Sequence, residues 1–92
     1  MVAVDFDGTI MIDGAPNRQL LARLRNMQRQ GATIVLWTCR AGQRLHDAVR
    51  FCVQHGLKPN YVNCNPPDVI RRLGYDPRKV CADIYIDDKS VN

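Results

Sequence analysis

Short, uninterrupted apolar runs alternate along the chain with segments in which apolar residues recur every three or four positions. Uninterrupted runs are typical of buried strands, and the longer spacing is typical of amphipathic helices. The runs predict four strands, at 1–5, 32–38, 61–63 and 81–87. Helical spacing predicts a helix opened by Pro16 and Asn17 and ended by Gly31, a helix over 43–55, and a short helix over 68–73. We expect a loop between Thr9 and the first helix.

The alternation of strands and helices predicts an α/β fold. Strand–helix–strand units give a parallel sheet with right-handed crossovers. We therefore expect a three-layer, Rossmann-like arrangement of about four parallel strands with helices on both faces. No repeat, low-complexity segment or interdomain linker interrupts the 92 residues, so the prediction is a single domain over 1–92.

The composition is that of an ordinary globular protein, with 46% hydrophobic and 24% charged residues. No apolar run approaches the roughly 20 residues that span a bilayer, and no basic stretch followed by an apolar segment opens the chain. We expect neither a membrane span nor a secretory signal. The four cysteines, Cys39, Cys52, Cys64 and Cys81, lack the spacing of zinc ligands, which favours reduced thiols in a cytoplasmic protein.

The net charge of +4 hides an uneven distribution. Four of the nine acidic residues fall in two motifs, at positions 5 and 7 and at positions 87 and 88. If those four surround a cation, the remaining surface is more basic than the total suggests and favours anionic partners such as phosphates or nucleic acid. The alternative is that scattered arginines only keep the protein in solution.

Polar side chains follow three of the predicted strands. Asp5 and Asp7 follow the first strand, Thr38 ends the second, and Asp87 and Asp88 end the last. The carboxyl ends of parallel strands lie at the edge where open α/β sheets bind ligands. Clustered carboxylates repel one another unless a cation joins them, and Mg²⁺ suits a set of oxygen donors. Strand-end aspartates can also simply cap helices or make turns, which explains one motif alone better than all three together.

These motifs resemble those of the haloacid dehalogenase-like (HAD) hydrolases. The segment DFDGT at 5–9 looks like the first family motif, LWT at 36–38 like the second, and IYIDD at 84–88 like the acidic fourth. The segments LWTCRAG and ADIYIDD are most similar to the small capless phosphatases of bacteria and phages, and ADIYIDD is also similar to the 5′(3′)-deoxyribonucleotidases. The resemblance implies a HAD-like core domain, and the short connections leave no room for a cap domain.

The resemblance gives each residue of the first motif a role. Asp5 would be the nucleophile that forms an aspartyl-phosphate. Asp7 would offer its backbone carbonyl to Mg²⁺ and its side chain as general acid and then base, for which its pKa should be raised by the neighbouring Asp5. Gly8 would allow the tight turn, and the Thr9 hydroxyl would fix it.

The second and fourth motifs would bind phosphate and metal. Thr38 would donate a hydrogen bond to a phosphate oxygen, helped by the backbone N–H of Cys39, whose side chain we expect to pack in the interior. Asp88 would bind Mg²⁺ directly and Asp87 through water, although the two could be exchanged. The complete metal set implied is Asp5, Asp7, Asp87 and Asp88.

The third family motif is a lysine that neutralises the phosphate. Lys79 is the best match because it precedes ADIYIDD, although a residue just before a strand normally lies at the opposite edge of the sheet. Arg40 and Arg78 are the substitutes, and Arg40 is also a candidate for binding substrate.

The function that follows is a Mg²⁺-dependent phosphatase with an open site. Such a site suits a nucleotide, a sugar phosphate or a polynucleotide end, and a homo-oligomer covering the site in trans would also be compatible. One alternative is a catalytically weak HAD-like protein that binds phosphate or nucleic acid or acts as a regulator. A receiver-type signalling domain is a further alternative, but receivers place the acidic pair on the first strand and the phosphorylated aspartate on the third.

Overall fold

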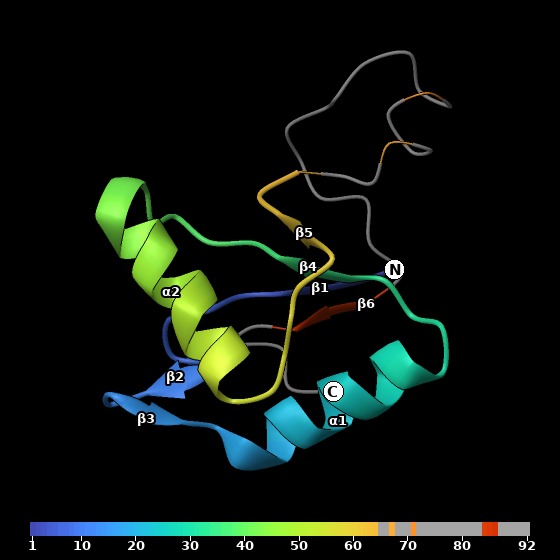
Figure 1. The fold of residues 1–92 in the computed structure, drawn as a ribbon, viewed down its shortest axis with the longest axis horizontal. Coiled ribbons are helices and arrows are strands. Elements are labelled where there is room, and N and C mark those ends of the chain that lie inside the picture. The colour runs from blue at the N-terminus through green and yellow to red at the C-terminus, as the bar shows by residue number, and fades with distance from the viewer. Residues whose placement is uncertain (65–66, 68–70, 72–83, 87–92) are drawn as a thin grey trace.

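The core of the protein is a parallel sheet with β1 in its interior. The computed structural model describes residues 1–64, 67, 71 and 84–86. Strand β1 (Val2–Val4) lies between β4 (Ile34–Leu36) and β6 (Ile84–Ile86), and β5 (Tyr61–Val62) pairs with the other side of β4 (Figure 1). Every pairing among these four strands is parallel. The predicted α/β fold with a parallel sheet is confirmed.

The pairing register aligns the carboxyl ends of β1, β4 and β6. Val4 pairs with Leu36 on one side and with Ile86 on the other. The residues that follow β1 and β4 therefore leave the sheet side by side at its carboxyl edge. This geometry is what the alternation of strands and helices predicts for consecutive parallel strands.

The two described helices match the predicted ones closely. Helix α1 (Arg18–Arg29) starts at Asn17, whose side chain accepts a hydrogen bond from the N–H of Leu20 at 3.3 Å. Helix α2 (Gly42–Gln54) ends just before Gly56, which has φ +87°. An asparagine N-cap satisfies one of the free N–H groups of the first turn, and a glycine past the last turn adopts the positive φ that ends a helix.

Both helices pack on the same face of the sheet. Side chains alternate along a strand, so Val2 and Val4 of β1 share a face with Ile34 and Leu36 of β4. These residues form one buried cluster with side chains of both helices, namely Leu20, Leu21 and Leu24 of α1 and Ala48 and Cys52 of α2. Of the third predicted helix, over 68–73, the structure describes Arg71 alone, which is helical, so helices on both faces stay a prediction.

A hairpin occupies the segment predicted to be a loop. Strands β2 (Met11–Ile12) and β3 (Ala15–Pro16) pair antiparallel and are joined by Asp13 and Gly14. Both turn residues have positive φ, at 50° and 80°, which is the geometry of a type I′ turn. The loop prediction is wrong because each strand has two residues, too few for an alternating pattern to show.

The cysteines of the described segments are free thiols. Cys52 is fully buried, and burial raises the pKa of its thiol to about 11, so it acts as a small apolar core residue. Cys81 lies outside the described residues. In the part of the chain that the structure describes, no helix combines the length and the apolar character needed to cross a bilayer.

Candidate active site

Asp5 is anchored at the carboxyl end of the central strand. Its backbone N–H donates to the carbonyl of Ile86 at 2.9 Å, and the N–H of Trp37 donates to the carbonyl of Val4 at 2.8 Å. The peptide group between Val4 and Asp5 is therefore hydrogen-bonded to β6 through its N–H and to the residue after β4 through its carbonyl. The backbone at the start of Asp5 is thus fixed from both sides.

A tight turn follows Asp5 and carries Asp7 outward. The buried Phe6 accepts three backbone hydrogen bonds at its carbonyl, from Thr9, Ile10 and Met11, at 3.2, 2.9 and 3.1 Å. Gly8, with φ +77°, donates its N–H to the carbonyl of Met11 at 2.9 Å. The predicted role of Gly8 in a tight turn is confirmed, because a side chain is disfavoured at this φ.

The Thr9 hydroxyl does not fix the turn. Thr9 is only 4% exposed, and its Oγ1 has no hydrogen-bond partner among the residues that the structure describes. The predicted role of this hydroxyl is therefore wrong. Backbone hydrogen bonds hold the turn, together with the side chain of Asn17, which donates from Nδ2 to the carbonyl of Thr9 at 3.1 Å.

Arg40 forms a bidentate ion pair with Asp7, in which it donates a hydrogen bond to each carboxylate oxygen. Its Nε donates to Oδ2 at 2.9 Å and its Nη2 to Oδ1 at 2.7 Å. The guanidinium carbon also lies 4.7 Å from the centre of the Phe6 ring, a cation–π distance. The side chain of Arg40 is 14% exposed and that of Asp7 is 51% exposed, so the arginine is packed against the protein and the carboxylate faces solvent.

This ion pair reverses the expected electrostatics of Asp7. The hydrogen bonds from Arg40 stabilise the ionised carboxylate and lower its pKa, and they raise the pKa of Arg40 in turn. The slight burial of Asp7 acts in the other direction but is the weaker effect. The predicted raised pKa of Asp7 is wrong for this structure, because the hydrogen bonds from Arg40, which the sequence did not reveal, outweigh the effects that raise it.

Thr38 is held at the end of β4 by both of its polar groups. Its N–H donates to the side-chain Oδ1 of Asn63 at 2.7 Å, and its Oγ1 accepts from the N–H of Arg40 at 3.2 Å. A hydroxyl that accepts one hydrogen bond keeps its own hydrogen for a second partner. The Thr38 hydroxyl can therefore still donate a hydrogen bond to a phosphate oxygen, and this contact stays a prediction.

Asn63 is a site residue whose role the sequence did not reveal. Its backbone N–H donates to the carbonyl of Leu36 at 2.8 Å while its side chain holds Thr38. It has φ +51°, a conformation that asparagine tolerates better than most residues. An asparagine directly after a short strand is the only signal that the sequence offered.

The predicted packing role of Cys39 is wrong, because its side chain is exposed. Donation of its backbone N–H to phosphate remains a prediction. Lys79, Arg78, Asp87 and Asp88 lie outside the described residues, so the structure does not place them.

The described part of the site supplies oxygen donors suited to Mg²⁺ but not a full metal site. Among the described residues, no group of three or more His, Cys, Asp or Glu side chains could hold a metal ion. Asp5 and Asp7 offer carboxylate and carbonyl oxygens, which Mg²⁺ prefers. In the sequence Asp87 directly follows β6, the strand paired with β1. The described oxygen donors fit the chemistry of magnesium, and a contribution from the fourth motif stays a prediction.

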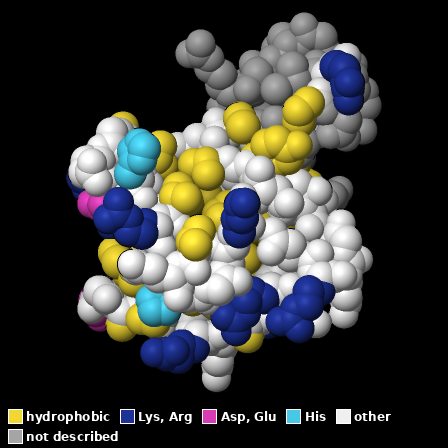
Figure 2. Space-filling model, viewed as in Figure 1, with side chains coloured by type: hydrophobic (Ala, Val, Ile, Leu, Met, Phe, Trp, Pro, Cys, Tyr) yellow, Lys and Arg dark blue, Asp and Glu magenta, His cyan; other side chains and the backbone are white. Residues whose placement is uncertain are grey.

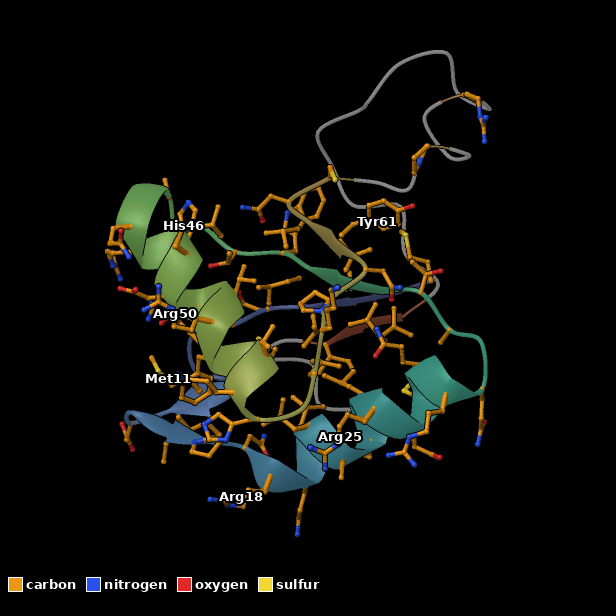
Figure 3. All side chains as sticks on the ribbon, viewed as in Figure 1. Met11, Arg18, Arg25, His46, Arg50 and Tyr61 are labelled. Carbon is orange, nitrogen blue, oxygen red and sulfur yellow. The ribbon has the colours of Figure 1, made fainter. Side chains whose placement is uncertain are left out.

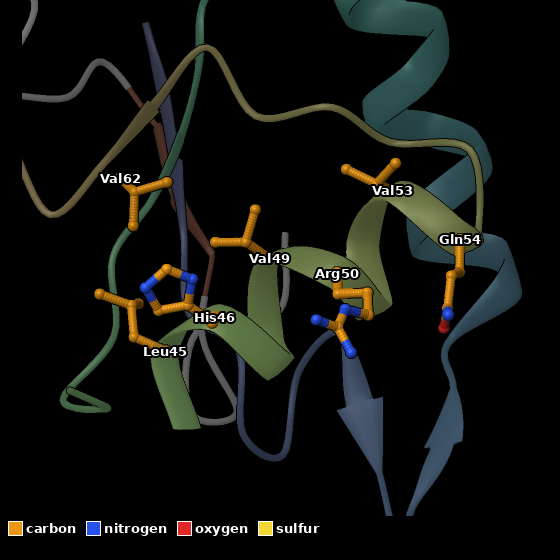
Figure 4. Close-up of a pocket in the computed structure, with 7 residues that line it drawn as sticks. All are labelled: Leu45, His46, Val49, Arg50, Val53, Gln54 and Val62. Atoms are coloured by element: carbon orange, nitrogen blue, oxygen red, sulfur yellow. The ribbon is translucent and has the colours of Figure 1, made fainter. Parts of the chain in front are cut away.

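A separate hollow of ≈ 480 Å³ is lined by residues of α2 and by Val62 of β5 (Figure 4). Its walls are mainly aliphatic, from Leu45, Val49, Val53 and Val62. The polar side chains of His46, Arg50 and Gln54 complete the lining.

Comparison with known proteins gives one informative match. No family model and no curated protein matches the sequence. A solved structure of a conserved protein from Bacteroides thetaiotaomicron matches with a TM-score of 0.82 and 33% sequence identity. The match covers 98% of this chain and 76% of that one. This chain belongs to the same family as the Bacteroides protein. That relative is described as a conserved protein, so the family supports the fold and gives no activity to this chain.

Proposed function

We propose that the protein is a Mg²⁺-dependent phosphatase that cleaves a phosphomonoester through an aspartyl-phosphate on Asp5. The main support is the position of Arg40. Its side chain binds Asp7 after β1, and its backbone N–H binds Thr38 at the end of β4. The first two motifs are therefore joined in one site.

Asp5 would attack the phosphorus. A bond forms between an Asp5 carboxylate oxygen and phosphorus while the bond from phosphorus to the leaving oxygen breaks, and that oxygen takes a proton from Asp7. A water molecule then attacks the phosphorus, gives its proton to Asp7, and releases phosphate and free Asp5. Magnesium bound by the Asp5 carboxylate, the Asp7 carbonyl and the fourth-motif aspartates would cancel the repulsion between carboxylate and phosphate.

The ion pair between Arg40 and Asp7 sets a condition on these reaction steps. In the described geometry Asp7 is held ionised, so it is a base and not a proton donor. A phosphate dianion entering beside Thr38 would compete for the guanidinium, because one guanidinium edge cannot hold two anions at once. Movement of Arg40 to the phosphate would release Asp7, whose pKa would then rise toward that of a proton donor.

The HAD-like, three-layer core without a cap is part of the proposal. The half-exposed carboxylate of Asp7 supports an open site. The hairpin β2–β3 lies between Asp7 and α1 and is far too short to form a covering domain. Nucleotides, sugar phosphates and polynucleotide ends all remain suitable substrates.

Hydrolysis of p-nitrophenyl phosphate with Mg²⁺ or EDTA tests this function. Wild type should turn over only with Mg²⁺, and Asp5→Asn should lose at least about 10³-fold in kcat/KM. Asp13→Asn is the matched control, since Asp13 is an exposed residue of the hairpin turn and asparagine tolerates its positive φ, and this variant should keep its activity. Equal rates for the wild type and Asp5→Asn would overturn the assignment of the nucleophile.

A catalytically weak phosphate-binding protein is the second candidate. The observation in its favour is the closed Asp7–Arg40 pair, which holds the general acid in the wrong protonation state. This second candidate predicts that the wild type does not turn over substrate but binds phosphate in the presence of Mg²⁺. Isothermal titration calorimetry would detect that binding.

A further inference from the structure

Arginines gather on the face formed by α1 and α2. Figure 3 shows Arg18 and Arg25 on α1 and Arg50 on α2, all on the side toward the viewer, and we call these three residues the arginine face. In the same view, several Lys and Arg side chains show as separate patches on the lower half of the molecule, while acidic side chains show only at the left edge (Figure 2).

The α1 part of this face has no compensating carboxylate, whereas α2 carries Asp47 three residues before Arg50. Helix α1 contains four arginines and no acidic residue. Among the described residues, neither Arg18 nor Arg50 forms an ion pair with a carboxylate. The carboxylate of Asp7 is paired with Arg40. Unpaired like charges on one surface repel each other and attract polyanions.

A hollow between the helices presents two of these guanidinium groups together. It measures ≈ 370 Å³ and is lined by Arg18, Arg25, Gln54 and His55, with Leu21 and Gly56. The Nη1 of Arg25 donates to the carbonyl of His55 at 2.7 Å, which leaves its other N–H groups to bind a ligand. Donors of this kind, fixed in advance beside a second arginine, match a phosphate group.

Gly56 makes room for the Arg25 side chain. A Cβ at position 56 would lie 2.8 Å from Nη1 of Arg25, closer than atoms can pack. The glycine that ends α2 therefore also allows the guanidinium to sit against the end of that helix. The hydrogen bond to the carbonyl of His55 holds the guanidinium in that position.

The surroundings favour a nucleic-acid backbone over other polyanions. Of the two exposed large apolar side chains in the described part, Ile12 lies in the hairpin and Val53 on α2. The two helices of the face therefore present one exposed large apolar side chain, whereas a membrane-binding helix presents a whole apolar side. Binding of single strands relies on exposed aromatic rings for base stacking. The described aromatic residues Phe6, Trp37, Phe51 and Tyr61 are buried or half-buried.

We propose that the arginine face binds the phosphate backbone of double-stranded nucleic acid without reading its sequence. This inference goes beyond the proposed phosphatase and does not require turnover. Backbone phosphates bind arginine by charge-assisted hydrogen bonds and release counterions, so binding depends steeply on salt.

Fluorescence anisotropy with a short labelled DNA duplex of mixed sequence, over a series of KCl concentrations, tests the proposal. Wild type should bind at low salt with a linear dependence of log K on log salt. The double variant Arg18→Gln/Arg50→Gln should bind roughly tenfold more weakly at low salt and should lose about one unit of slope for each phosphate contact removed. Arg25 is left unchanged because it also holds the end of α2.

Arg23→Gln is the matched control. Arg23 lies on the same helix but about 140° around it from Arg18, so its loss should leave the slope unchanged. Thermal unfolding of every variant shows that each is folded. The proposal fails if wild type does not bind the duplex at low salt, or if the double variant keeps the wild-type slope. Tighter binding of poly-glutamate or of anionic lipid vesicles than of the duplex would assign the face to an acidic protein or a membrane instead.

Discussion

The contact between Arg40 and Asp7 is the residue-scale feature on which the chemistry depends. Both residues were predicted at the site from the sequence, since each follows a strand in a recognisable motif. Their pairing was not predictable, because it depends on how far a long side chain reaches between two loops. The direction of the Asp7 pKa followed from that pairing and so was also missed.

The pair should make stability depend on pH in a specific way. The pKa of Asp7 is lowered in the folded protein from its ordinary value of 3.8, so the pair stabilises the fold above this value and loses its effect as the pH falls through the lowered pKa. Arg40→Gln should lower the free energy of unfolding at pH 7 by about 0.5–1 kcal/mol, a modest amount because Asp7 is half-exposed. Urea unfolding at a series of pH values measures the difference.

The lost packing of Arg40 on Phe6 is the same at every pH, so only the part of the difference that shrinks in acid reports the ion pair. Arg23→Gln should give a small difference that does not vary with pH. A difference for Arg40→Gln that grows as the pH falls would contradict the account.

The two buried threonines of the site should respond oppositely to loss of their hydroxyls. Thr9→Val removes a hydroxyl without a described partner and should raise the free energy of unfolding by about 1 kcal/mol. Thr38→Val leaves the N–H of Arg40 without its acceptor and should lower it by about 1 kcal/mol. Chemical denaturation of both variants decides this, and a destabilised Thr9→Val would show that its hydroxyl has a partner after all.

At the scale of elements, the helices were predictable and the hairpin was missed. Leu20, Leu21 and Leu24 recur at helical spacing and are the residues that α1 buries, so the pattern and the packing agree. The hairpin had a local signal in Asp13–Gly14, since Asp-Gly is a favoured type I′ turn. Its strands were too short to alternate visibly, and Pro16 suggested the start of a helix.

The glycines that follow the two helices offer a matched comparison. Gly31 and Gly56 have φ of +100° and +87°, and a Cβ would meet nothing within 4 Å at Gly31 but the Arg25 side chain at Gly56. Gly31→Ala should cost about 1 kcal/mol of stability for the backbone alone. Gly56→Ala should cost about 1 kcal/mol more, because Arg25 must give up its hydrogen bond to His55.

A double-mutant cycle with Arg25→Ala isolates this contact. The extra cost of Gly56→Ala should disappear once Arg25 is truncated, and urea denaturation gives all four free energies. Equal costs at Gly31 and Gly56 in the wild-type background would mean that Arg25 moves aside freely.

At the scale of the whole molecule, the sequence predicted the parallel sheet and the edge that carries the site. The alternation of strands and helices implied both, because parallel strands end at one edge. The order β5-β4-β1-β6 was not predictable in detail, since it depends on which side of β1 the last strand joins. That order places Asp5 between two neighbouring strands. The positions of Lys79, Asp87 and Asp88 stay predictions, as they lie outside the described residues.

The central claim is that Asp5 carries the phosphoryl group, and trapping that group tests it most directly. The protein is mixed with Mg²⁺ and p-nitrophenyl phosphate, quenched in acid within one turnover, and digested for peptide mass spectrometry. We predict a phosphoryl group on Asp5 in the wild type and none in Asp5→Asn. Turnover with no phosphoryl group on the protein, or with one on any other residue, would contradict the account.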